Sequence, residues 1–177
     1  MSNFLQKNCN NGKALDIGTG FGAFLPVLSR THQEVVAVDC SMDQIKVASD
    51  LCGYMQLPNV KVEKIPKENG LITFKDFEFD TILATDLLEH NLNYKFIIDE
   101  IHRILKPNGI CIITLPTKHF VYRLLARREV EKDETRGHVY HSYRGLVEVE
   151  TYIKNKFREL VYKDDLTFIH IHILTKR

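Results

Sequence analysis

The chain has 177 residues, of which 44% are hydrophobic and 27% are charged, and this is the composition of an ordinary folded domain. Its length predicts one domain that covers residues 1–177, and its composition excludes intrinsic disorder as the main state. The 24 Lys and Arg residues against 23 Asp and Glu residues give a formal net charge of +1, so a generally basic surface for nucleic acid is excluded.

The sequence also argues against export and against a membrane span. The first dozen residues are too polar for a signal peptide, and no apolar run reaches the roughly 20 residues that cross a bilayer. The four cysteines are scattered without a CxxC pair, which indicates neither a disulfide framework nor a zinc site. We therefore expect a soluble, cytoplasmic protein with no membrane partner.

Short apolar runs alternate with amphipathic segments through the first two thirds of the chain. In chain order, the pattern predicts a strand at 13–17, a helix at 21–31, a strand at 34–38, a helix at 42–54, strands at 60–65 and 79–84, a helix at 93–105 and a strand at 110–115. This alternation predicts a parallel sheet with helices on both faces.

The last third has a different character. A charged segment at 118–145 leads into a predicted helix at 146–156, and two predicted strands follow at 157–163 and 167–175. The link between these strands is only about three residues long, which predicts an antiparallel hairpin. Within the last strand His170 and His172 share one face, and we expect them on the polar side of the hairpin.

A glycine-rich loop follows the first predicted strand. It reads Asp16-Ile-Gly18-Thr-Gly20-Phe-Gly22, and glycines at such a point let the backbone approach a ligand and adopt positive φ. Asp39 ends the second strand, where a carboxylate can accept two hydrogen bonds from a ribose diol. The spacing is GxGxG rather than GxGxxG, which argues against a dinucleotide-binding dehydrogenase.

Four segments in this order resemble the motifs of class I S-adenosylmethionine-dependent methyltransferases. ALDIGTGFG resembles the first motif of that family, VVAVDCS the second, FDTILATDLLEHN the fourth and EIHRILKPNGICIITLP the fifth. The resemblance covers roughly residues 13–116 and is closest to the group of small, type-11-like methyltransferases. It implies an α/β fold: a Rossmann-like, doubly wound sheet of seven strands in the order 3-2-1-4-5-7-6, with the last strand antiparallel. The hairpin predicted above agrees with this order.

The resemblance implies S-adenosylmethionine as the cofactor. Asp16 and the glycine loop would hold its methionine part, Asp39 its ribose hydroxyls, and the residues after the fourth strand would line the cleft shared with the acceptor. The predicted cofactor-binding residues are Asp16, Gly18, Thr19, Gly20, Gly22, Asp39, Cys40, Ser41, Glu68, Thr85 and Asp86. One departure concerns adenine: Pro66 stands where the family commonly has an acid. Glu68 or Asn69 is a candidate replacement, and backbone and apolar contacts are the alternative.

The candidate catalytic residues are Asp86, His90 and His141, because a hydroxyl or protonated amine acceptor needs a general base. If the segment Asp86-Leu-Leu-Glu89-His90 is helical, its three polar side chains share one face. With His141 they loosely resemble the ligand set of metal-dependent small-RNA 2′-O-methyltransferases, which would make Asp86, Glu89, His90 and His141 the ligands. In the alternative, which we favour, no metal binds and the Glu and His satisfy donors of the loop and the helix end.

The connection at 118–145 is the only segment left to form a lid. Between residues 118 and 144 it carries seven basic and four acidic residues, a local charge of +3, with Tyr122, Tyr140 and Tyr143 interleaved. It could grip an anionic or RNA substrate, stacking bases on its tyrosines. The alternative, which we favour, is a solvated helix pair held by ion pairs.

These observations predict an enzyme that transfers a methyl group from S-adenosylmethionine to an unidentified acceptor. A small molecule is expected, because such acceptors are the commonest in the group that the chain resembles. The alternatives are an RNA or protein methyltransferase that uses the basic 118–144 segment, and a cofactor-binding module without catalysis. A homo-oligomer, in which a second chain completes the cleft, also stays open.

Overall fold

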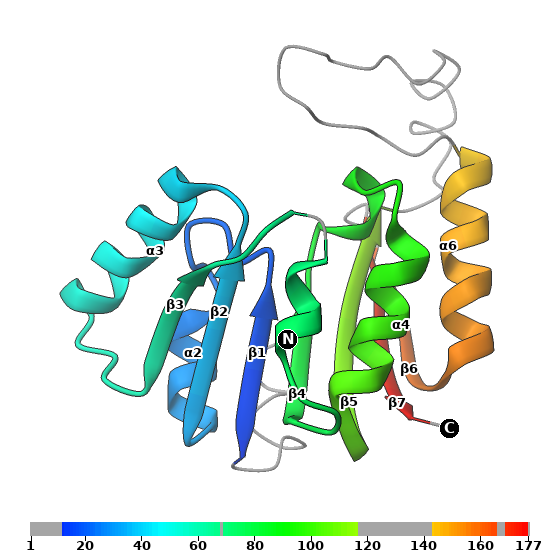
Figure 1. Ribbon diagram of the computed structural model, residues 1–177. Helices are drawn as coiled ribbons and strands as arrows, with labels where there is room; N and C mark the ends of the chain where they lie inside the picture. Colours follow the sequence, from blue (N-terminus) through cyan, green and yellow to red (C-terminus); the bar gives the residue numbers. More distant parts are fainter. Residues whose placement is uncertain (1–11, 68, 117–142, 166–168, 177) are drawn as a thin grey trace.

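The computed structural model describes residues 12–67, 69–116, 143–165 and 169–176 (Figure 1). Its described residues form one seven-stranded sheet in the order β3-β2-β1-β4-β5-β7-β6. The strands are β1 (Lys13–Ile17), β2 (Glu34–Asp39), β3 (Val60–Lys64), β4 (Phe79–Ala84), β5 (Leu105–Pro116), β6 (Phe157–Asp165) and β7 (Ile169–Lys176). The helices are α2 (Leu25–Thr31), α3 (Met42–Tyr54), α4 (Tyr94–Ile104) and α6 (Tyr143–Lys156), with short 3₁₀ helices η1 (Gly70–Thr73) and η2 (Leu88–His90).

The strand order and directions confirm the predicted α/β fold. Strands β3, β2, β1, β4 and β5 pair in parallel, while β7 is antiparallel both to β5 and to β6. A final strand that inserts between its predecessor and β5 is the seven-stranded arrangement that the motifs implied. The predicted terminal hairpin, β6 with β7, is therefore confirmed.

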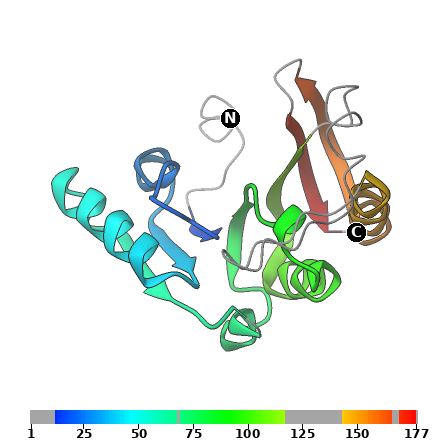
Figure 2. The same cartoon turned by 90° about the horizontal axis from the view of Figure 1, so that it is seen from above.

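Helices cover both faces of the sheet, as the alternation of elements predicts. One core cluster joins the sheet to α4 and α6 through side chains such as Ile98, Ile101 and Ile153. The second joins the opposite face to α2 and α3 through Leu28 and Ala48. Figure 2, seen from above, shows α4 and α6 on one side of the sheet and α2 on the other. Two covered faces explain why the central strands β1, β2 and β4 are buried over nearly their whole length rather than at alternate residues.

Two predicted boundaries differ from the structure by four residues or more, each for a local reason. The first helix begins at Leu25 rather than at 21, because the glycine loop continues in turns up to Phe24 and Pro26 then occupies the first turn of α2. Strand β5 begins at Leu105, directly after α4, rather than at 110. Asn108 adopts a φ of 62°, and the pairing with β4 shifts register between Phe79 and Thr81, so the Pro-Asn-Gly segment forms an irregularity within the strand.

The prediction for the two histidines of β7 is also wrong. His170 and His172 are 4% and 0% exposed, and they face α6 rather than a polar surface. Glu150 of α6 lies 3.0 Å from Nδ1 of His170, and Glu159 of β6 lies 2.7 Å from Nδ1 of His172. Burial lowers the pKa of His172, while the two acids oppose that shift. Sequence alternation identified the shared face, but only the packing of α6 buries it.

Within the described residues, the helices are too short or too polar for any of them to cross a membrane.

Candidate functional site

Three strand ends meet at one edge of the sheet, where the predicted cofactor residues lie. Ile17 of β1 is in register with Val38 of β2 and with Ala84 of β4. The segments that follow these strands therefore leave the sheet from neighbouring positions. Figure 2 is seen from the side to which the carboxyl ends of these strands point in Figure 1. Ligands of open parallel sheets bind at this edge.

The glycine loop is tied to β2 by its own backbone. The N–H groups of Gly18 and Thr19 both donate to the carbonyl of Val38, at 2.8 and 3.0 Å. Gly18, Gly20 and Gly22 adopt φ values of 70°, 54° and 86°, a region that disfavours residues with a side chain. The predicted need for glycine in this loop is thus a matter of backbone conformation.

Gly20 and Gly22 differ in what surrounds them. A Cβ built on Gly22 would lie 2.9 Å from Cδ1 of Leu25 and 3.2 Å from Cδ2 of Leu51, so a side chain there would have to displace these leucines. A Cβ on Gly20 would meet one atom within 4 Å, Oε1 of Gln44 at 3.9 Å, among the described residues. The loop therefore packs against α2 and α3 at Gly22 and leaves open space at Gly20, where a ligand could approach the backbone.

Asp39 joins the glycine loop to the start of α3. Its Oδ2 accepts a hydrogen bond from the N–H of Gly20 at 3.0 Å, and its Oδ1 accepts one from the N–H of Ser41 at 2.8 Å. Ser41 in turn caps α3, because its Oγ accepts from the N–H of Gln44 at 3.5 Å. A carboxylate has about four acceptor positions, so both oxygens keep capacity for ribose hydroxyls. Cys40 lies exposed between Asp39 and Ser41.

Asp16 is a buried carboxylate with capacity for a cationic ligand. It is 1% exposed, and its Oδ2 accepts from the hydroxyl of Thr19 at 2.8 Å. Its Oδ1 is also buried and finds no donor in the described part of the chain. Burial raises the pKa of Asp16 to about 6, the hydrogen bond from Thr19 opposes the shift, and the charge of Asp39 adds to it. A buried carboxylate oxygen that lacks a hydrogen-bond donor fits the ammonium group of an amino-acid ligand.

The loop after β4 carries Thr85 and Asp86 and is fastened to β5. Thr85 is half-buried, whereas Asp86 is exposed and adopts a φ of 50°. The N–H of Asp86 donates to Oγ1 of Thr114 at 3.0 Å, and that hydroxyl lies 3.2 Å from Oδ1 of Asp86, to which it donates. Thr114 was not among the predicted site residues, although it is the one hydroxyl residue in the apolar run ICIITL.

The condition for a shared helical face of Asp86, Glu89 and His90 is not met. Only Leu88–His90 form a short 3₁₀ helix, and Asp86 precedes it with left-handed backbone. Among the described residues, the ligand atoms of these three side chains do not form a close group that could hold a metal ion. A different set of side chains does form such a group and is described below. His141, the fourth residue of that hypothesis, lies outside the described residues.

Glu89 is the unusual side chain of this segment. It is 4% exposed, and its Oε2 finds no donor among the described residues. Burial raises the pKa of Glu89 to about 7, its own backbone N–H opposes the shift, and the nearby charge of Asp86 adds to it. An acid that titrates near neutrality can accept or hold a proton, which makes Glu89 a further candidate beside Asp86 and His90.

Several predicted features lie outside the described residues. These are Glu68, His141 and nearly all of the 118–145 segment, so the lid and its RNA-binding alternative stay predictions. Near Pro66, the N–H of Ile65 donates to the carbonyl of Asp39 at 3.0 Å, which holds the end of β3 beside the ribose-binding candidate. Asn69 is exposed with a φ of 59°. How adenine would be held therefore also stays a prediction.

Comparison with known proteins identifies the family. Residues 15–113, more than half of the chain, match a family model described as "Methyltransferase domain". With the observed strand order and the acidic strand ends, this defines the class: the chain belongs to the class I S-adenosylmethionine-dependent methyltransferases. The cofactor of this family is S-adenosylmethionine, and the open backbone at Gly20 and the carboxylates of Asp16 and Asp39 fit it.

Individual relatives are distant. The chain is 24% identical over 169 residues to a ubiquinone biosynthesis O-methyltransferase of Psychrobacter arcticus, and the aligned region covers 93% of this chain and 65% of the relative. It is 29% identical over 120 residues to a demethylmenaquinone methyltransferase of Tropheryma whipplei, and the aligned region covers 65% of this chain and 48% of the relative. A solved S-adenosylmethionine-dependent methyltransferase of Methanosarcina mazei has a TM-score of 0.73 at 19% identity, with 98% of this chain and 96% of that chain covered. The chain thus spans less than two thirds of the curated relatives named here.

Proposed function

We propose that this chain transfers a methyl group from S-adenosylmethionine to a small-molecule acceptor of the class of quinone intermediates. Methyl transfer from S-adenosylmethionine is supported above all by the Asp39 carboxylate, which accepts hydrogen bonds from Gly20 and Ser41 beside the buried Oδ1 of Asp16. The names of the two curated relatives, which concern ubiquinone and demethylmenaquinone, support the acceptor class.

Different residues at this edge of the sheet would bind different parts of the cofactor. Asp39 would accept hydrogen bonds from the two ribose hydroxyls while its present bonds to Gly20 and Ser41 hold it in place. Asp16 would pair with the ammonium group of the methionine part, with its other oxygen held by Thr19. The open space at Gly20 lets the ligand approach the backbone.

The cofactor brings an activated methyl group, so the protein has mainly to orient the acceptor and exclude water. For a hydroxyl acceptor it must also take up one proton. Glu89, with its pKa raised to about 7, and the neighbouring Asp86 and His90 are the described candidates, and His141 stays a predicted one. The tie between Asp86 and Thr114 would keep this segment in place on β5.

Titration calorimetry with S-adenosylhomocysteine tests the binding site. We expect one site per chain and a loss of about 10- to 100-fold in affinity for Asp39→Ala, because charge-assisted hydrogen bonds contribute about 1.5–3 kcal/mol. Asp43→Ala is the matched control, since Asp43 is exposed in the first turn of α3 and is expected to leave affinity unchanged. Absence of binding to the wild-type chain would contradict the proposal.

A methylation assay with labelled S-adenosylmethionine tests the acceptor. The chain is incubated in parallel with hydroxylated quinone intermediates, with structured RNA and with a protein extract. Label in the quinone-type compounds is expected. Label in RNA or protein alone would replace this acceptor with the predicted alternatives, and binding without any transfer would favour the cofactor-binding module.

A further inference from the structure

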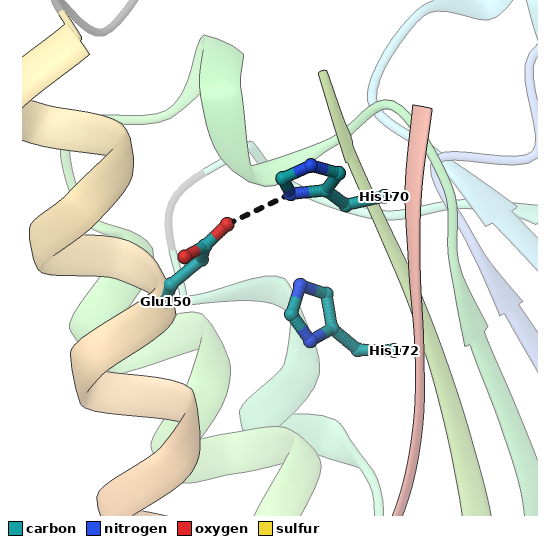
Figure 3. A group of neighbouring side chains, drawn as sticks. All are labelled: Glu150, His170 and His172. Atoms are coloured by element: carbon teal, nitrogen blue, oxygen red, sulfur yellow. Dashed lines mark hydrogen bonds and ion pairs between the residues drawn. The ribbon is translucent and has the colours of Figure 1, made fainter. Parts of the chain in front are cut away.

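A second cluster of chemically versatile side chains lies between α6 and the hairpin. It consists of Glu150, His170 and His172, which are 6%, 4% and 0% exposed (Figure 3). One ligand atom from each, an oxygen or a ring nitrogen, lies within 4.8 Å of the others. Within the described ranges, no other three residues of ligand type come together in this way. The methyl-transfer chemistry proposed above uses none of them.

The arrangement follows from the strand and helix that supply it. His170 and His172 alternate with isoleucines in β7, so both rings project from the same face of the sheet, with ring centroids 6.3 Å apart. α6 crosses this face and brings Glu150 over them, where its Oε1 lies 3.0 Å from Nδ1 of His170. Secondary structure and helix packing thus preorganise the three side chains.

Glu159 orients the ring of His172 from the neighbouring strand. Its Oε1 lies 2.7 Å from Nδ1 of His172, which places the ring hydrogen on that nitrogen and the lone pair of the neutral imidazole on Nε2. Figure 3 shows a ring nitrogen of His172 turned toward the Glu150–His170 pair. A carboxylate that accepts the second N–H of a histidine is the usual support of a metal-binding imidazole.

We propose that Glu150, His170 and His172 form a binding site for a divalent transition metal ion, with zinc as its simplest occupant. Two imidazole nitrogens and one carboxylate are a donor set that zinc and ferrous iron take in proteins, with further positions left for water or another ligand. Ligand atoms around a tetrahedral zinc ion lie about 3.4 Å apart, since each is about 2.1 Å from the metal. Shifts of about 1 Å in side-chain position would close the present cluster onto an ion.

Proton balance is simple at this site. His170 now shares a hydrogen between its Nδ1 and the Glu150 carboxylate. Coordination through Nδ1 needs its lone pair, so the hydrogen moves to Nε2 of the same ring or leaves to solvent as a proton. The metal would replace one helix-to-strand hydrogen bond by bonds to both elements, and would thereby clamp α6 onto β7.

The test uses the full chain, freed of metal with a chelator and titrated with Zn²⁺ by calorimetry. One ion per chain is expected, together with a higher thermal unfolding midpoint. Glu150→Gln and His172→Gln keep the approximate size of the side chains and are each expected to weaken binding at least tenfold. Glu159→Gln, which removes only the support of a ligand, is expected to weaken it by about 10–100-fold.

His90→Gln is the matched control, because it removes a histidine of the competing hypothesis near Asp86 while leaving this cluster intact. Its zinc affinity should equal that of the wild-type chain. Titration with Co²⁺ adds an optical readout, since imidazole and carboxylate ligands give weak visible bands without the strong near-ultraviolet absorption of cysteine ligands. Zinc affinity that survives in both Glu150→Gln and His172→Gln, or a cysteine-type cobalt spectrum, would overturn the proposal.

Discussion

At the scale of single residues, the site edge holds two acids whose ionised form is opposed by burial. Asp16 and Glu89 both have raised pKa values, mainly because they are removed from water, and each has one oxygen without a donor among the described residues. Keeping such groups costs the folded protein free energy. A cost of this kind is expected where a ligand completes the interaction, as the proposed cofactor would at Asp16.

Asp16→Asn should separate stability from function. Because the pKa of Asp16 is about 6 in the folded chain and about 3.9 unfolded, the folded state binds the proton more tightly, so this residue destabilises the fold as pH rises through that window. We expect Asp16→Asn to raise the free energy of unfolding by about 2–3 kcal/mol at pH 7.5. The difference should disappear near pH 4.

Urea unfolding of both proteins at several pH values measures this effect. Titration with S-adenosylhomocysteine should show at the same time that the variant has lost most of its affinity, because the amide cannot pair with an ammonium group. A variant that is less stable at pH 7.5 but binds normally would contradict both the pKa argument and the binding role.

At the scale of elements, the glycine loop combines a structural and a binding requirement at different positions. A side chain on Gly22 would have to displace Leu25 of α2 and Leu51 of α3, whereas Gly20, beside the Asp39 carboxylate, has open space around it among the described residues. Gly20 and Gly22 both have positive φ, which favours glycine at either position. Close packing is a second reason for glycine at Gly22.

Gly20→Ala and Gly22→Ala therefore form an informative pair. Gly20→Ala should cost about 1 kcal/mol of stability through its positive φ alone, yet weaken S-adenosylhomocysteine strongly, because the methyl group projects into space that the ligand would use. Gly22→Ala should cost about 2–4 kcal/mol, since overpacking against Leu25 and Leu51 adds to the strain. Chemical unfolding and calorimetry on both variants give the comparison, and equal losses of stability would show that the packing difference is unimportant.

At the scale of the whole molecule, one sheet places the two sites on a common frame. Ala84, Ile113 and His172 form one row across β4, β5 and β7, so the proposed metal cluster lies two strands away from the end of β4. β7 also lies inside the sheet rather than at its edge, with β5 on one side and β6 on the other. The C-terminal hairpin is therefore part of the framework on which the fold depends.

Leu174→Ala tests this dependence. Leu174 is completely buried in β7 within the cluster that includes α4 and α6, so its truncation should cost about 2–5 kcal/mol. The matched control is Leu160→Ala in the adjacent strand β6, because Leu160 is 47% exposed and should cost less than about 1 kcal/mol. Thermal or urea unfolding compares the two, and a small effect at Leu174 would mean that the hairpin contributes little to the cooperative unit.

Short-range patterns in the sequence, namely apolar periodicity and glycines at a turn, were sufficient for the alternation of strands and helices, the terminal hairpin and the glycine loop. The strand order was implied by the resemblance to the methyltransferase motifs and is confirmed, whereas Asp16 and Asp39 as the acids of the cofactor site stay predictions. Local patterns also explain the two larger boundary errors. Residues 21–24 form turns but were predicted as the start of a helix, and residues 105–109 belong to an irregular strand although Pro-Asn-Gly is typical of a helix end.

Only the tertiary structure decided which side chains are buried and what they meet. Thr114 secures Asp86 from 28 residues away, and Glu150 approaches His170 from another element, 20 residues earlier in the chain. No local periodicity encodes such pairs, because they depend on how helices cross the sheet. The sequence therefore determined the fold and the cofactor class of this protein, while the packing of α6 on β7 turned two apparently surface histidines into a buried cluster.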